Sequence, residues 1–262
     1  MKVEPPRHFF WLLCDAQSGE FLRAEGGELA LGSRADDGAC WELAAENRCR
    51  SAAASPAQEL QLTHRVDGQQ TYNVVGEHGQ RCSVQGLDGD FLLVRGPSEL
   101  PSVSLAQMRS EGWTVLPSIV HPDTIADMKR TFYEPGFFSR IQDLVNTTPS
   151  VAKTAVHPVM LYLLEEYIDG PIHVGGFNVA ITAPVPPDTV SGSGFGQGRG
   201  GWHSDYPFAY NQGPNLEEMP DNICLGCEWI TCVDDFSELN GVSASLPLAA
   251  TSASACGYSH AR

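Results

Sequence analysis

An imidazole and a carboxylate stand two residues apart in the segment 201–208, which directly follows a glycine-rich stretch. They belong to His203 and Asp205, and aromatic residues lie on both sides of the pair. On an extended strand, side chains at i and i+2 project from the same face, so the two groups could hold one metal ion. Two histidines and one carboxylate, with open positions left over, are the usual ligands of non-haem Fe(II). Because the His-x-Asp spacing is frequent by chance, its meaning depends on the surrounding sequence.

Net charge limits the partners that this chain can have. Among its 262 residues, 32 are acidic and 16 are basic, which gives a formal charge of −16. This charge repels nucleic-acid phosphates and anionic membrane surfaces, so we expect neither as a partner, although a local Arg or Lys could still hold an anionic substrate. The apolar run 9–14 is too short for a secretory leader or a membrane-spanning helix. These features predict a soluble, cytoplasmic protein, with 9–14 as a buried strand.

Eight cysteines are too few for a disulfide scaffold in a chain of this length, and they predict reduced thiols. Cys224 and Cys227 form a Cys-x-x-Cys pair, which can hold zinc or carry out redox chemistry. No second pair follows, and the range 223–233 predicts a buried strand on which these two thiols face opposite sides. We therefore interpret both thiols, and that of Cys232, as packing groups.

The first part of the chain, residues 1–97, predicts a small all-β domain that is rich in turns. Within it, the stretches 19–27 and 86–94 each place a Phe-Leu pair between glycine turns. This pattern resembles the repeats of the fascin-like β-trefoil group, and a generic small β-domain is the alternative. Such a domain would contact a protein or a carbohydrate rather than catalyse a reaction. Residues 98–104 then predict a linker.

The second part, residues 105–262, predicts short helices followed by strands. Its expected elements are a helix 104–111 with Ser104 as N-cap, a strand 113–116, a helix from Pro122 to about Gly136, a helix from Pro158 to just before Gly170, and strands at 177–182 and 223–236. Together with the first domain this predicts an α+β chain that is mainly β, in which helices pack outside a barrel. His157 and His173 stand beside prolines at helix ends, where capping or packing is expected rather than metal binding.

Three motifs in this second part resemble the phytanoyl-CoA dioxygenase family, a branch of the Fe(II)- and 2-oxoglutarate-dependent oxygenases. They are the Gly-Trp-Thr-Val-Leu-Pro segment 112–117 with the helix after it, the Trp-His-Ser-Asp segment 202–205, and the segment 229–241 that ends in Asn-Gly. Their order along the chain is more specific than any one motif. The resemblance implies a double-stranded β-helix, or jelly roll, over 105–262, and it implies a dioxygenase that hydroxylates a small organic substrate.

The same resemblance implies that His203 and Asp205 are two of three iron ligands, with 2-oxoglutarate as co-substrate. An aspartate at position 205 argues against the family's halogenating members, which have a small residue there. Asn178 and Thr182 lie four residues apart on one face of a predicted strand and could donate hydrogen bonds to the bound oxo acid. Ordinary packing inside the barrel is the alternative explanation for this pair.

The end of the chain departs from the family pattern. Ala250 stands where the resemblance places the second metal histidine, and alanine cannot bind iron. His260 is the only histidine after His203, so it is the candidate third ligand. Arg262 is the only basic residue in this region and the candidate for the distal carboxylate of 2-oxoglutarate. The jelly roll would then be incomplete at its C-terminal end. The alternative function is that of a catalytically impaired or truncated relative that acts as a binding or scaffold protein.

Overall fold

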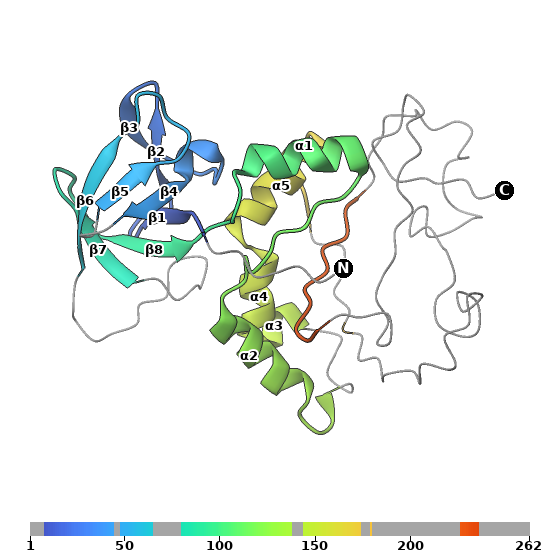
Figure 1. Cartoon of the computed structure of the whole chain (residues 1–262). Coiled ribbons are helices and arrows are strands. Elements are labelled where there is room, and N and C mark those ends of the chain that lie inside the picture. Colours follow the sequence, from blue (N-terminus) through green and yellow to red (C-terminus); the bar gives the residue numbers. More distant parts are fainter. Residues whose placement is uncertain are drawn as a thin grey trace.

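The computed structural model describes residues 8–44, 48–64, 80–137, 144–173, 179 and 226–235. Within them the chain is α+β, with a closed six-stranded antiparallel barrel that is followed in sequence and in space by a layer of helices (Figure 1). This is compatible with the predicted α+β class, and the described part before residue 97 consists of strands with one short 3-10 helix, Asp37–Ala39. In these ranges, no helix is both long enough and apolar enough to cross a membrane.

Every strand pair in the sheet is antiparallel. The sheet order is β3-β2-β1-β4-β5-β6-β7-β8, and an additional pairing of β1 with β8 closes the barrel and leaves β2–β3 as an attached hairpin. The strands are β1 (Trp11–Asp15), β2 (Phe21–Glu25), β3 (Glu28–Gly32), β4 (Trp41–Ala44), β5 (Arg48–Ser51), β6 (Glu59–His64), β7 (Gln80–Val84) and β8 (Phe91–Arg95).

The ladder between β1 and β8 is buried on both of its faces. Because side chains alternate along a strand, Leu13 faces the inside of the barrel, whereas Leu12 and Cys14 face the helices. In the same way β8 sends Leu93 inward and Leu92 outward. A strand that is covered on both sides has an unbroken apolar sequence rather than an alternating one, and this explains the apolar run that predicted a buried strand here.

The two similar stretches of the first domain lie on opposite sides of β1. Phe21, at the start of β2, pairs with Cys14, and Phe91, at the start of β8, pairs with Asp15. The glycine turns that precede β8 need backbone conformations that other residues rarely adopt, since φ is +85° at Gly86 and +104° at Gly89. The repeated pattern therefore reflects two strands that flank the same central strand.

Inside the barrel the side chains form one cluster around an indole. Trp41 is fully buried, and its Nε1 donates a hydrogen bond of 2.9 Å to the carbonyl oxygen of Leu22. Burial raises the pKa of the free thiols, to about 12 for Cys49 and about 11 for Cys82, so both are protonated apolar packing groups. We call this cluster the barrel core; its buried members are Leu13, Leu22, Ala24, Trp41, Cys49, Leu60, Leu62, Cys82, Val84, Phe91 and Leu93.

Four of the five α-helices in the described ranges begin at a proline. Proline suits the first helical position because its fixed φ matches the helix and its missing N–H has no helical acceptor there. The helices expected at Pro122 and Pro158 are confirmed, whereas the two short helices between them were not predicted. The helices are α1 (Pro101–Glu111), α2 (Pro122–Phe132), α3 (Leu144–Thr147), α4 (Pro149–Ala155) and α5 (Pro158–Ile168).

Two predictions around α1 are wrong. The helix begins at Pro101 with Leu100 as N-cap, so Ser104 is a buried residue of the first turn and not the cap. The predicted strand 113–116 is an irregular segment. Gly112 ends the helix in the left-handed region with φ at +82°, and the hydroxyl of Thr114 then donates a hydrogen bond of 2.9 Å to Oε1 of Gln107. This local turn competes successfully with the β-propensity of the segment.

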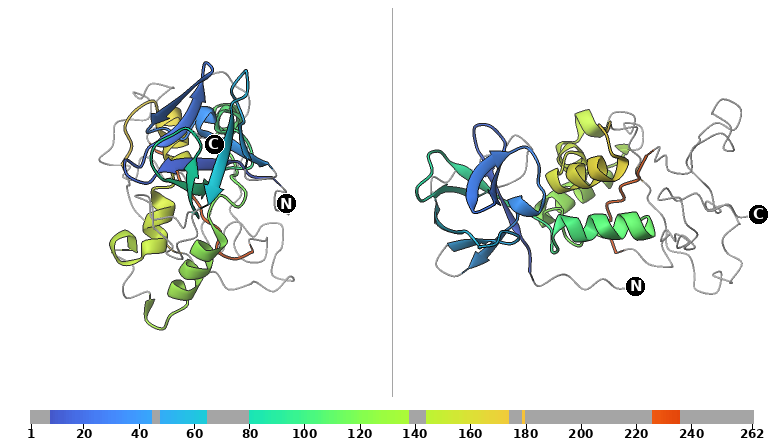
Figure 2. Two further views of the ribbon diagram at one scale, coloured as in Figure 1. Left: turned by 90° about the vertical axis from the view of Figure 1, so that its left-hand side faces the viewer. Right: turned by 90° about the horizontal axis from the view of Figure 1, so that it is seen from above.

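The barrel and the helical layer share one hydrophobic core, which we call the interface core. Its members come from both sides, with Leu12 and Val94 on the barrel and Leu105 and Val159 on α1 and α5. Figure 2 shows the two parts in direct contact in the view from above. The full set of buried members is Phe10, Leu12, Cys14, Phe21, Ala35, Ala39, Cys40, Leu92, Val94, Leu105, Met108, Ile119, Val120, Val159 and Leu163.

Polar contacts surround this interface core. Nη2 of Arg34, in the loop after β3, lies 2.6 Å from Oε1 of Glu166 on α5. The backbone N–H of Ser102, at the start of α1, donates a hydrogen bond of 2.8 Å to the carboxylate of Asp37. The range 98–104, predicted as a linker, thus contains the first turn of a helix that is tied to the barrel. The domain boundary itself stays a prediction.

We predict that Val159→Ala weakens the barrel and the helices together. Val159 is fully buried in the interface core, so removing two methyl groups should lower the free energy of unfolding by about 1–3 kcal/mol. Urea unfolding should show this loss both by tryptophan fluorescence and by helical circular dichroism. The matched control is Val103→Ala on α1, where the side chain is 51% exposed and the change should be small. Two separate transitions in the parent protein would contradict a shared core.

Candidate functional site

The residues predicted to bind iron and 2-oxoglutarate lie outside the described ranges. This applies to every predicted site residue and to the alanine at the expected ligand position, namely Asn178, Thr182, His203, Asp205, Ala250, His260 and Arg262. The structure does describe two segments that flank them in sequence. These are the single residue Val179, which follows Asn178, and the range 226–235, which overlaps the first part of the third family motif, 229–241.

Both flanking segments pack on the same group of helix side chains, which we call the α2–α4 cluster. Its buried members are Met128, Phe132, Phe137, Leu144 and Val151.

Val179 and Val233 are both partly buried against this cluster. Residues that are 54 positions apart in sequence therefore lie on one surface of the helical layer. In the family pattern, Val179 belongs to the strand before the glycine-rich loop, and Val233 belongs to the segment that leads to the Asn240-Gly241 turn.

The range 226–235 crosses the helical layer as an extended segment. In Figure 1 it is the orange-red trace beside the helices. Its burial alternates: Cys227, Trp229, Thr231 and Val233 are half-buried, and the residues between them are exposed. Trp229 packs against the interface core and donates a hydrogen bond of 2.7 Å from Nε1 to the hydroxyl of Thr231.

The prediction of a buried strand over 223–236 is wrong for the described part of that range. Gly226 to Asp235 has no regular secondary structure and is covered on one side only, by the helices. Cys227 is half-buried and Cys232 is exposed, so Cys232 is not a core packing group, while Cys224 lies outside the described ranges. The apolar sequence of this range predicts an extended chain correctly. It does not distinguish a strand that pairs with other strands from an extended segment that packs on helices.

Asp234 fastens this segment to α2 by two polar contacts. Its carboxylate forms an ion pair with Nζ of Lys129 and accepts a hydrogen bond of 2.8 Å from the hydroxyl of Tyr133. The hydrogen bond from Lys129, followed by that from Tyr133, holds the pKa of the Asp234 carboxyl below its usual value, and the same contact raises the pKa of Lys129. Sequence analysis missed this group, because nothing local marks Lys129 and Tyr133 as partners of a residue so much later in the chain.

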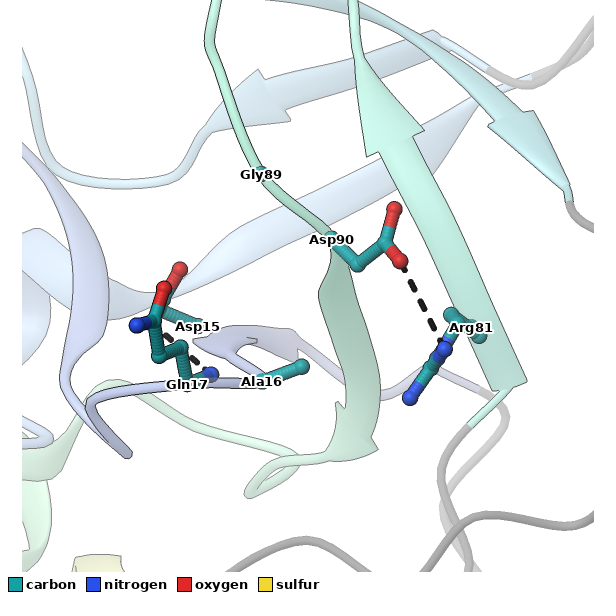
Figure 3. Close-up of a pocket in the computed structure, with 6 residues that line it drawn as sticks. All are labelled: Asp15, Ala16, Gln17, Arg81, Gly89 and Asp90. Atoms are coloured by element: carbon teal, nitrogen blue, oxygen red, sulfur yellow. Dashed lines mark hydrogen bonds and ion pairs between the residues drawn. The ribbon is translucent and has the colours of Figure 1, made fainter.

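A shallow, open hollow of about 520 Å³ lies at one end of the barrel (Figure 3). On one side, Asp15 Oδ1 accepts hydrogen bonds from the backbone N–H groups of Gln17, at 3.0 Å, and Ser18, at 2.6 Å. Partial burial acts to raise the pKa of Asp15, but these hydrogen bonds outweigh it and the net shift is downward. On the other side, Nη1 of Arg81 lies 3.5 Å from Oδ2 of Asp90. These polar groups stabilise the turns of the barrel, and the hollow contains none of the predicted site residues.

His157 is the most strongly perturbed histidine that the structure describes. It occupies the N-cap position of α5, its side chain is fully buried, and burial lowers its pKa from 6.5 to about 4. The expectation that it packs at a helix end is confirmed by this burial, whereas His173 is exposed. Within the described ranges, no three His, Cys, Asp or Glu side chains come together in a group that could hold a metal ion.

No protein-family model, curated protein or solved structure matches this chain. The resemblance to the phytanoyl-CoA dioxygenase family therefore depends on the three sequence motifs, and the function that it implies is a proposal.

We predict that His157 makes the protein less stable in mildly acidic solution. The unfolded chain binds a proton as the pH falls below 6.5, whereas the folded protein does so only near 4. The free energy of unfolding should therefore fall by roughly 3 kcal/mol between these pH values. Urea titrations at pH 7, 5.5 and 4.5 measure this slope, which His157→Leu should flatten and His173→Leu should leave unchanged. An equally steep slope in His157→Leu would show that other groups cause it.

Proposed function

We propose that this chain is an Fe(II)- and 2-oxoglutarate-dependent dioxygenase with a jelly-roll domain after residue 105. One observation supports this beyond the motifs. Val179 and Val233 flank the two predicted halves of the site, and both rest on the α2–α4 cluster. A common platform of this kind would hold the strand of Asn178 near the chain that leads to the second metal histidine. Helices packed outside a barrel would supply such a platform.

The donor set fits ferrous iron. His203 would supply an imidazole nitrogen and Asp205 a carboxylate oxygen, with His260 as the candidate third donor. Bound Fe(II) would activate dioxygen together with 2-oxoglutarate, so that a C–H bond of a small organic substrate is hydroxylated and the oxo acid is decarboxylated. The other residues would hold the oxo acid: Asn178 and Thr182 by hydrogen bonds, and Arg262 by a bidentate contact with the distal carboxylate.

We place this activity in the cytoplasm, and the free thiols of the barrel support that location because reducing compartments preserve them. The N-terminal barrel would contact a protein or a carbohydrate and carry no catalytic residue. It would also support the helical layer through the interface core.

A second candidate function is that of a binding or scaffold protein derived from this family. Ala250 favours it, because the expected metal histidine is missing at that position and two protein ligands bind iron less firmly than three. The two functions differ in whether the C-terminal segment supplies a donor.

We predict that the protein binds Fe(II) and 2-oxoglutarate together. Anaerobic titration should give the weak visible charge-transfer band of a 2-oxo acid chelated to ferrous iron. His203→Ala and Asp205→Ala should each abolish it because each removes a ligand, whereas His173→Ala, at an exposed histidine, should leave it unchanged. A parent protein that shows no such band would contradict the dioxygenase proposal.

We further predict that His260 determines how firmly iron is held. If it supplies the third donor, His260→Ala should raise the Fe(II) half-saturation concentration by at least about tenfold, since even outer-shell changes cost that much. Ala250→His serves as the complementary variant, because it restores the family's ligand at its usual position. Unchanged binding in His260→Ala, combined with tighter binding in Ala250→His, would favour the binding-protein alternative.

A further inference from the structure

We propose that Lys129, Tyr133 and Asp234 form a latch that positions the segment leading to the predicted metal site. Its significance for iron rests on the proposed function. The geometry of the latch is independent of that function, because the structure describes all three residues and the contacts between them. Lys129 and Tyr133 would be positioning residues, which act through the chain that follows Asp234 rather than by touching substrate or metal.

Two faces of α2 take part in this arrangement. Met128 and Phe132 are buried in the α2–α4 cluster, whereas Lys129 and Tyr133 follow them by one residue each and are exposed. Tyr133 is the C-cap of α2, four positions after Lys129, and its backbone N–H donates a hydrogen bond to the carbonyl oxygen of Lys129, so the two side chains are neighbours at the end of the helix. The helix thus offers an apolar face and, next to it, an ammonium group and a phenol hydroxyl.

The extended segment matches these two faces with consecutive residues. Val233 packs on the apolar cluster, and Asp234 then meets Lys129 and Tyr133 together. The chain bends at Val233 and Asp234, so these consecutive residues contact the apolar cluster and the polar pair of Lys129 and Tyr133. At the other end of the segment Trp229 packs against the interface core. The segment is therefore fixed at two points, and the second point depends on charge.

The latch limits where the following chain can go. Asn240 stands six residues after Asp234, and six extended residues span at most about 20 Å. The Asn-Gly turn and the residues after it therefore start from a point that α2 defines. Releasing Asp234 would remove this fixed starting point, and under the proposed function it would lower the fraction of molecules in which a C-terminal donor meets His203 and Asp205.

We expect the latch to affect the position of the segment 226–235 more than the free energy of unfolding of the whole protein. Lys129 is 50% and Asp234 is 38% exposed, and ion pairs at such sites add little to the free energy of unfolding. A matched control lies on the same helix, where Arg130 pairs with Asp127 three residues earlier. That pair is also exposed, but it joins two residues of α2 and does not contact the extended segment.

Limited proteolysis with an endoproteinase that cuts before aspartate tests the latch itself. It can cleave the 233–234 and 234–235 bonds, and the double variant Lys129→Met/Tyr133→Phe keeps both of these sites. Cleavage there, mapped by mass spectrometry, should become about three- to tenfold faster in the double variant, because the segment leaves α2 more often. Arg130→Met should match the parent, and equal helical circular dichroism would verify that α2 is intact. Equal cleavage rates in the double variant and the parent would overturn the latch.

A second measurement tests its positioning role. In the anaerobic Fe(II) and 2-oxoglutarate titration, the double variant should need about three- to tenfold more iron for half-saturation, with the parent's band shape at saturation. Lys129→Arg should retain parent-like binding because it keeps the cation, and Arg130→Met should do so as well. Faster cleavage with unchanged iron binding would overturn the positioning role. A parent that binds no iron would refute the proposed function, while the proteolysis result would still decide whether the latch exists.

Discussion

The burial of both faces of the β1–β8 ladder is the constraint on which the rest of the structure depends. One face supplies Leu13 and Leu93 to the barrel core, and the other supplies Leu12 and Leu92 to the interface core with the helices. An apolar strand cannot leave either face in water without a large loss of hydrophobic stabilisation, so the barrel needs the helical layer as its cover. The ion pair between Arg34, after β3, and Glu166, on α5, adds a polar contact between the barrel and the helical layer.

The helical layer has a second surface, and this is where the architecture becomes relevant to function. Trp229 packs against the interface core, and Val233 and Val179 both pack against the α2–α4 cluster. The helices thus connect a barrel that has no proposed chemistry to the segments that flank the proposed iron ligands. In this account, the barrel stabilises the helices, and the helices determine where the segments of the predicted jelly roll begin and end. The ion pair of Asp234 with Lys129 adds a polar contact beside the apolar contacts of Trp229 and Val233.

Local signals predicted much of the fold, and non-local pairings did not. Proline at the first helical position, with apolar spacing after it, was sufficient to predict the helices at Pro122 and Pro158. The segment 113–116 has strand propensity, but the left-handed Gly112 and a hydrogen bond back to α1 decide its conformation. Barrel closure through β1 and β8 joins residues about 80 positions apart, which no local pattern reveals. For the site, the motifs supplied the candidate ligands. The latch was missed because its hydrogen bond joins Tyr133 to a residue 101 positions later.

The most direct test of the central claim is iron K-edge X-ray absorption on the anaerobic protein loaded with Fe(II) and 2-oxoglutarate. We predict a first shell of nitrogen and oxygen ligands with the outer-shell scattering of an imidazole ring, and a loss of that imidazole signal in His203→Ala. Iron that shows no imidazole scattering, or a spectrum identical in the parent and His203→Ala, would contradict the claim that this chain builds a ferrous site around residue 203.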